Sequence, residues 1–107
     1  MKIYKTQREI EKDIKNGVLE IDGDVTFECS FSINASIKVN AGNITAGDIN
    51  AGNINAWNIN AGDISYYAFC VVYDSIKCIS IKAKREKAQE PICLDGKLEI
   101  KQKEEIE

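Results

Sequence analysis

Four cysteines are the residues of this chain best suited to chemistry, because a thiolate can bind zinc or act as a nucleophile. They are Cys29, Cys70, Cys78 and Cys93. Zinc sites usually take their thiolates from pairs with two to four residues between them, whereas 40, 7 and 14 residues separate these four. A nucleophilic thiol needs a partner base, and the 107 residues include no histidine. We therefore expect free thiols that pack as small apolar side chains, and a small Cys-based metal or redox protein is the less favoured alternative.

Carboxylates offer a second kind of site. Asp22, Asp24 and Glu28 would come near Asp48 or Asp63 only if successive turns of the fold stacked favourably. Acidic residues in turns more often bond the backbone of their own turn. No glycine-rich stretch has the spacing that binds phosphate. We predict no catalytic, cofactor-binding or metal-binding residue, and we predict that the protein is not an enzyme.

Aromatic side chains are the best candidates for protein contacts, since they carry large contact areas and are enriched at interface hot spots. We select Trp57, Tyr66, Tyr67 and Tyr73. Trp57 is expected to contact another chain or the terminal segments. For the tyrosines, a place in the core is favoured over an interface. Leu98 and Ile100, near the C-terminus, complete the interaction candidates because they lie at the end of the fold described next.

These residues are positioned by a repeat that runs through residues 40–65. Five units share the order polar, Ala, Gly, Asn or Asp, Ile, so isoleucine recurs at 44, 49, 54, 59 and 64. A period of five matches neither the helical period of 3.6 nor the strand period of 2. Short strands joined by corners do fit it, because Ile and the Ala two places later point the same way. The repeat predicts a solenoid with Ile and Ala inside.

Trp57 indicates which way the corners face. It occupies the slot that holds glycine at 42, 47, 52 and 62. No tight interior accepts Gly and Trp alike, so this slot should face outward and need not have a positive φ. The Asn/Asp slot beside it predicts a ladder of corner hydrogen bonds. The outward residues Thr45, Asn50, Asn55, Asn60 and Ser65 should lie on different sides, which argues against one flat ice-binding face.

The repeat resembles that of the pentapeptide-repeat family, whose right-handed β-helix has four five-residue sides per coil. Here the Ala follows the Ile by two places, whereas the family's usual order has the small residue two places before the large one. The chain also resembles bactofilin-type proteins, with their Gly-rich, short-strand β-helix and their habit of forming polymers. Square and triangular coils are therefore both open. The resemblance implies a small bacterial or phage protein, and some pentapeptide-repeat proteins are inhibitors of other proteins.

The N-terminal segment predicts a helical cap. Thr6 and Glu9 have the spacing of a capping box, Ile10 and Ile14 share one face, and residues 16–17 (Asn-Gly) supply a stop. The expected helix spans residues 7–15. It is too short to stand alone in water, so it should dock on the open end of the solenoid.

Looser strands are expected on both sides of the repeat. The inward pairs before it are Leu19/Ile21, Val25/Phe27, Phe31/Ile33 and Val39/Ala41. The inward pairs after it are Ile76/Cys78 and Ile81/Ala83, two residues out of phase, which predicts a bulge or longer corner at residues 73–75. Residues 84–91 are expected to form a loop or a single helical turn, and residues 94–100 a last turn and strand.

Together these patterns predict an all-β, single-stranded, right-handed β-helix with a short N-terminal helical cap. One domain is expected: a cap at residues 1–17, the β-helix at 18–100 and a flexible tail at 101–107. About four coils follow from about 20 residues per coil, and a triangular coil would give five or six.

The charge and hydropathy of the chain limit the classes of binding partner that we expect. The formal net charge is −3, which argues against general binding of nucleic acid or of an anionic membrane. The charged N-terminal residues lead us to expect no signal peptide, and the longest apolar run is far shorter than the ~20 residues of a spanning helix. We therefore expect a cytoplasmic protein.

The predicted function is a non-enzymatic structural or protein-interaction module that self-associates through the uncapped solenoid end. A homo-oligomer, and specifically a dimer, is expected, because an exposed last coil can pair with its own copy while the helical cap stops a filament. The alternative is a binder or inhibitor of a specific cellular protein.

Overall fold

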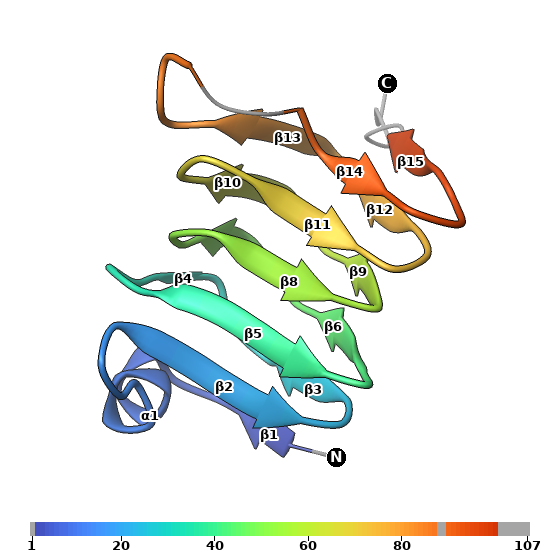
Figure 1. Ribbon diagram of the computed structural model, residues 1–107. Coiled ribbons are helices and arrows are strands. Elements are labelled where there is room, and N and C mark those ends of the chain that lie inside the picture. The colour runs from blue at the N-terminus through green and yellow to red at the C-terminus, as the bar shows by residue number, and fades with distance from the viewer. Residues whose placement is uncertain (1, 88–89, 101–107) are drawn as a thin grey trace, which may run out of the picture.

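The computed structural model describes residues 2–87 and 90–100. They form a β-solenoid of about four turns with one short helix near the N-terminus, as predicted (Figure 1). In Figure 1 the front strands run from left to right while the chain climbs, so the winding is right-handed. Each full turn adds one strand to each of three sheets, and all the strand pairs are parallel. The coil is therefore triangular, which the repeat alone left open.

The three sheets are called A, B and C, and the strands of each are given in order from the N-terminal end of the solenoid. Sheet A contains β1 (Lys2–Tyr4), β3 (Val25–Phe27), β6 (Asn43–Thr45), β9 (Asn58–Asn60), β12 (Ile76–Cys78) and β15 (Leu98–Ile100). Sheet B contains β2 (Val18–Asp22), β5 (Ser36–Asn40), β8 (Ile54–Ala56), β11 (Cys70–Val72) and β14 (Ile92–Cys93). Sheet C contains β4 (Phe31–Ser32), β7 (Ile49–Asn50), β10 (Asp63–Tyr66) and β13 (Ser80–Ala83).

The length of a coil varies along the solenoid. Ile44 pairs with Ile59, so one coil within the strict repeat takes up three of its five-residue units, one for each side of the triangle. Leu19 pairs with Ile37, and Ile76 with Leu98, so the coils outside the repeat are longer. The prediction of about four coils is thus confirmed. The five or six expected for a triangle are wrong, because longer corners use up the additional residues.

The interior follows the repeat with one exception. All five repeat isoleucines are buried, as are Ala51, Ala56 and Ala61, and Ala46 is half-buried. Ala41 is exposed and has φ 53°, so the predicted inward pair Val39/Ala41 is wrong. Strand β5 continues to Asn40, which moves Ala41 into the corner and leaves Ile37 as the inward partner of Val39. The other inward pairs predicted before the repeat are buried.

The corners carry the predicted ladders of hydrogen bonds. Between sheets B and A, Asn58 Nδ2 donates to Asn43 Oδ1 over 2.9 Å, and Asn58 Oδ1 accepts from the Ser75 backbone N–H over 2.9 Å. Between sheets A and C, Asp48 Oδ1 accepts from the Asp63 N–H over 2.8 Å. Each side chain thus satisfies a backbone or side-chain donor of the next coil, which fixes the stacking register.

The repeat glycines have no positive φ, and Trp57 in the same slot is exposed, as predicted. The outward polar residues of the repeat are also distributed as expected. Thr45 and Asn60 lie on sheet A, Asn50 and Ser65 on sheet C, and Asn55 on sheet B.

The N-terminal helix is shorter than predicted. It spans Gln7–Lys12 as α1, and the capping box of Thr6 and Glu9 is present. The chain leaves the helix at Asp13, whose carboxylate accepts a hydrogen bond from Tyr4 Oη, and then turns through residues 16–17, which both have positive φ. Ile10 is buried in the core. The Ser32 N–H donates to Gln7 Oε1 over 3.1 Å, so the helix covers the lower edge of β4.

Strand β1 was not predicted. It pairs with β3 and brings Tyr4 over Phe27 with ring centroids 5.3 Å apart, while Phe27 and Phe31 are 4.4 Å apart. These rings fill the first coil. The helix thus stands in for a sheet C strand below β4, between β1 and β2 in the chain (Figure 1).

The phase shift after the repeat arises at two corners. Ile49 pairs with Ile64, Ile54 with Cys70, and Ile59 with Ile76, so the coil becomes longer by a single residue at each of two successive corners. One additional residue therefore lies between β10 and β11. The second lies at residues 73–75, where both had been predicted.

Within the described residues, no helix is long and apolar enough to cross a membrane. The predicted tail at residues 101–107 lies outside the described residues.

Candidate functional site

The outer surface of sheet B carries a cluster of apolar side chains over its C-terminal half, which we call the apolar face. Its members are Trp57, Tyr67, Phe69, Val71, Tyr73, Ile92 and Leu94. Val71 is half-buried, and the other six side chains are between 40% and 62% exposed. Single exposed apolar residues are normal, whereas a group of them on one side of the molecule makes this surface a candidate for interaction.

The geometry of β11 creates most of this face. Cys70 and Val72 point into the core, so their neighbours along the strand, Phe69, Val71 and Tyr73, must point outward. Val71 is in register with Ile92 of the coil above. One coil below, the residues that correspond to Phe69 and Val71 are Asn53 and Asn55, so two outward positions change from polar to apolar at this strand.

Trp57 and Tyr73 form the edge of the apolar face at the corner between sheets B and A. Their ring centroids are 6.0 Å apart, with 35° between the ring planes. The backbone holds them in adjacent coils, because the Tyr73 N–H donates to Ala56 O over 3.0 Å and the Asp74 N–H donates to Trp57 O over 2.9 Å. The two rings therefore present one continuous aromatic surface.

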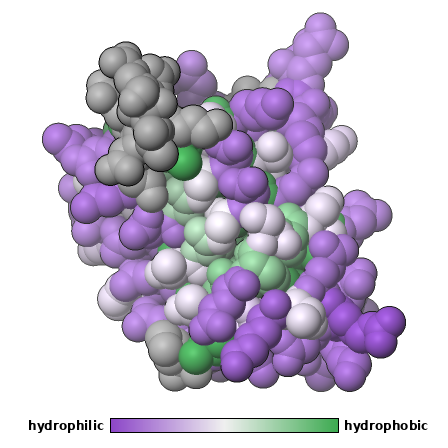
Figure 2. Space-filling model, turned by 180° about the vertical axis from the view of Figure 1, so that it is seen from behind, coloured by the Kyte–Doolittle hydropathy of each residue, from purple (hydrophilic) through white to green (hydrophobic). Residues whose placement is uncertain are grey.

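The opposite side of the molecule has a different character. Figure 2 shows mostly hydrophilic atoms there, surrounding a central region of white and pale-green atoms. Most outward residues of sheets A and C are polar or charged, including Asn43, Thr45, Asn60, Lys77 and Lys82, and Ile3 of β1 is an exposed apolar exception. Sheet B is thus the sheet with an extended apolar outer surface among the described strands.

The C-terminal end of the solenoid is a second candidate surface. Leu98 and Ile100 are in register with Ile76 and Cys78, which are fully buried. Leu98 and Ile100 are nevertheless 36% and 55% exposed, because no described coil lies above them. A hollow of about 540 Å³ opens here and is lined by apolar side chains, including Ile81 and Leu98, and by charged ones such as Lys82 and Glu90.

Tyr66 differs from the other interaction candidates. It is 2% exposed, so it is a core residue and contributes no outer surface. Its side chain lies in β10 in register with Ala83 and lines the hollow at the C-terminal end. Burial raises the pKa of its phenol. Trp57, Tyr67 and Tyr73 are about half exposed, and all three belong to the apolar face.

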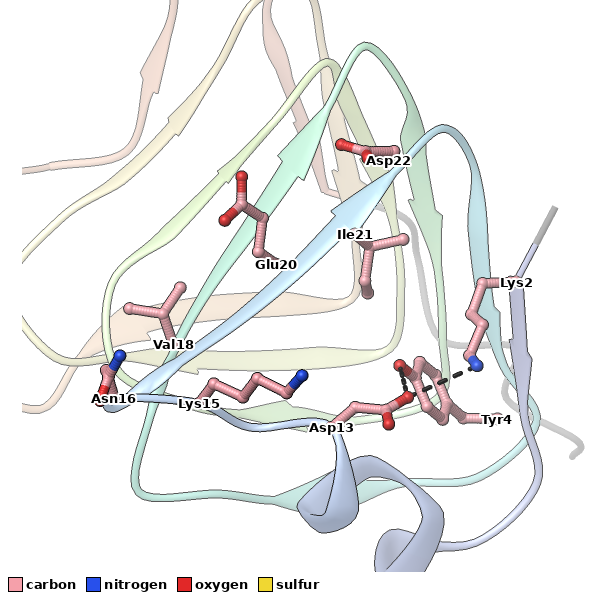
Figure 3. Close-up of a pocket in the computed structure, with 9 residues that line it drawn as sticks. All are labelled: Lys2, Tyr4, Asp13, Lys15, Asn16, Val18, Glu20, Ile21 and Asp22. Carbon is pink, nitrogen blue, oxygen red and sulfur yellow. Dashed lines mark hydrogen bonds and ion pairs between the residues drawn. The ribbon is translucent and has the colours of Figure 1, made fainter.

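The N-terminal end has a hollow of about 680 Å³ beside α1, shown in Figure 3. Tyr4 Oη donates to Asp13 Oδ2 over 2.7 Å, and Lys2 Nζ lies 3.4 Å from the same oxygen. The hydrogen bond from Tyr4, with Lys2 beside it, lowers the pKa of Asp13. Burial and the neighbouring Asp13 raise the pKa of Tyr4. These contacts tie the residue that ends α1 to β1 and so fasten the cap.

Three of the four cysteines lie in environments that favour the thiol. Cys70 and Cys78 are fully buried, and Cys29 and Cys93 are half-buried. Burial raises the pKa of Cys70 to about 12, and burial also raises the pKa of Cys29 and Cys93. A raised pKa opposes both metal binding and nucleophilic attack, because both need the thiolate. Within residues 2–87 and 90–100, no three His, Cys, Asp or Glu side chains are grouped closely enough to hold a metal ion.

Comparison with known proteins does not assign this chain to a family. No family model, no curated protein and no solved structure matches this chain. The arguments about function therefore depend on the surfaces described above.

Four residues of the apolar face were missed in the sequence: Phe69, Val71, Ile92 and Leu94. Residues 66–73 are apolar throughout, but only the tyrosines of this run were selected as candidates. The period of two within the run was the available signal. Once Cys70 and Val72 are placed inside, that period assigns residues 69, 71 and 73 to the surface.

Proposed function

We propose that this protein is a non-enzymatic structural or protein-interaction module that self-associates through the C-terminal end of its solenoid. The observation that carries the proposal is the exposure of Leu98 and Ile100. Both occupy inward positions, and the equivalent residues one coil below are fully buried. Side chains at core positions that no described residue covers favour a partner that completes the core.

The backbone supports the same interface. Strands β13, β14 and β15 are the last strands of their sheets, and within the described residues their upper edges have no strand partner. Such an edge presents unpaired N–H and C=O groups that template pairing with another chain. Three edges at one end, around the hollow lined by Ile81 and Leu98, form a surface that a second copy can cover.

A dimer is favoured over a filament. Pairing of one C-terminal end with another is isologous and closes after two copies. A filament needs the C-terminal end of one copy to stack on the N-terminal end of the next. There α1 occupies the side of sheet C below β4, so the three sheets cannot all continue into a neighbouring copy.

The family resemblance supports a scaffold role without assigning a partner. Bactofilin-type proteins are β-helices that polymerise, and pentapeptide-repeat proteins include inhibitors of other proteins. The present coil has three sides where the pentapeptide-repeat coil has four, so the bactofilin-like description is the closer of the two. The buried thiols suit a reducing cytosol.

Solution mass tests the proposal. Light scattering over a hundredfold range of concentration up to about 10 μM, below the range in which weak interfaces form, should give a dimer for the wild type and a monomer for Ile100→Lys, since lysine cannot be buried unpaired in the dimer core. Thr45→Lys is the matched control: it adds the same side chain to the outer surface of sheet A, far from the end, and should remain a dimer. Circular dichroism checks that both variants fold.

Three results would count against this function. A wild type that is monomeric throughout this range has no self-association through the end, and an Ile100→Lys variant that is still dimeric within it associates elsewhere. A wild-type mass that keeps growing within this range would replace the closed dimer with a polymer.

A further inference from the structure

The outer surface of sheet B changes character half-way along the solenoid. Its lower part is polar: Asn40 Nδ2 donates to Glu20 Oε2 over 2.8 Å and to Asp22 Oδ1 over 2.9 Å, with Lys38 exposed beside them. Its upper part is the apolar face. Both parts are built from the same short parallel strands, so the fold itself does not require the change.

We infer that the apolar face is a two-fold interface with a second copy of this chain, separate from the contact at the solenoid end. Its area is the first argument. Taking roughly 200 Å² for a whole aromatic side chain, the four half-exposed rings offer about 400 Å². Ile92 and Leu94 add about 100 Å² more. Two copies would therefore bury about 1,000 Å², which is where a specific protein interface begins.

The shape of the surface is the second argument. Strands β8, β11 and β14 stack in parallel in one sheet (Figure 1), and sheets of this kind pack face to face about 10 Å apart. An isologous pair brings a surface against itself, so every contact that one copy makes across the interface is repeated by the other.

Charge at the two borders is the third argument. The corner next to sheet C leads into residues 84–90, which contain Lys84, Arg85 and Lys87 against Glu86 and Glu90, a net charge of +1. The corner next to sheet A has Asp74 and Asp95 against Lys97, a net charge of −1. A two-fold axis parallel to the solenoid axis places each corner opposite the other corner of the second copy. The apolar halves then meet, and charges of opposite sign border them.

The chain carries its own probe of this interface. Trp57 is the single tryptophan of the sequence and lies on the apolar face, half exposed. Formation of the face-to-face dimer buries it, whereas pairing through the solenoid end leaves it in water. Its fluorescence therefore distinguishes the two contacts.

The experiment uses the full chain with Ile100→Lys, which removes the end contact. Light scattering and acrylamide quenching of Trp57 are measured together from about 1 μM to 1 mM, a range that covers weak interfaces. We expect a twofold rise in mass, accompanied by a blue shift of the emission and a fall in the quenching constant. Adding Leu94→Lys should abolish all three changes, and adding Thr45→Lys should abolish none.

Each other outcome overturns the inference. A constant monomer with Trp57 accessible at the highest concentration shows that the face does not pair with itself. A rise in mass without protection of Trp57 places the contact elsewhere. Protection of Trp57 at every dilution with monomeric mass shows that a segment of the same chain covers the face. If the face stays free but another protein added at known concentration protects Trp57, the occupant is foreign.

Discussion

Gly42 provides a demanding test of how the coils stack. A Cβ at this position would overlap the carbonyl carbon and oxygen of Gly23 and would lie 2.6 Å from Asp24 N. These are backbone atoms of the coil below, so no side chain can rotate away. The φ of Gly42 is not positive, and the predicted cost of Gly42→Ala therefore arises from overlap between coils and not from strain of its own backbone.

The magnitude follows from what must move. Separating the two coils at this corner lengthens the hydrogen bond from Gly23 N–H to Asn40 O, now 2.8 Å, and the one from Asn43 N–H to Asp24 Oδ1, now 2.9 Å. Each contributes about 1 kcal/mol, and overpacking adds about 1–3 kcal/mol. We expect Gly42→Ala to lower the free energy of unfolding by about 3–5 kcal/mol, measured by urea denaturation followed by circular dichroism.

Gly62→Ala is the matched control in the same slot of the repeat. The nearest atom to its Cβ would be Asp48 Oδ1 at 2.5 Å, and the nearest backbone atoms lie at 3.6 Å. A carboxylate can rotate, with loss of its bond to the Asp63 N–H, so this change should cost about 1 kcal/mol. Equal costs for the two variants, or a Gly42→Ala variant within about 0.5 kcal/mol of the wild type, would refute the stacking argument.

Two further predictions concern titrating groups. Burial raises the pKa of Cys70 from 9.0 to about 12, so its contribution to stability is complete below pH 9 and is lost as the pH rises toward 12, by up to about 4 kcal/mol. Urea denaturation of Cys70→Ala should show a flatter decline over that range than the wild type, and parallel declines would refute the assignment. The hydrogen bond from Tyr4 lowers the pKa of Asp13, so Asp13 stabilises the fold at neutral pH and loses this effect as the pH falls through its lowered pKa. Tyr4→Phe should raise the pKa of Asp13 in an NMR titration, and an unchanged pKa would show that the hydrogen bond has no effect in solution.

The five-residue repeat predicted the parts of the fold that depend on which way a side chain points. The inward Ile residues, the outward slot of Trp57 and the corner ladders all follow from the short-strand period. The number of sides does not follow, because five residues per side are compatible with a triangle or a square. Pairing between coils decides it, as in Ile44 with Ile59, and such pairing joins residues that are a whole coil apart in the sequence.

Errors occurred where a tertiary contact outweighed a local pattern. The helix was expected to reach residue 15, because Ile14 continued its apolar face, but it ends at Lys12. The hydrogen bond between Asp13 and Tyr4 ties the end of the helix to β1, and β1 itself was not predicted. Three residues at the N-terminus give too short a pattern to indicate a strand, and β1 is defined by its pairing with β3.

The contrast between β8 and β11 bears most directly on function. In β8 the outward residue is Asn55, and in β11 the residue in register with it is Val71. Both strands bury their inward neighbours completely or almost completely, so an outward polar residue serves the coil as well as an apolar one. The apolar residues on the outer surface of β11 and β14 therefore contribute little to the packing of a single chain. They expose apolar surface to water at a cost in solubility, and burial against a second molecule is the physical role that this surface fits.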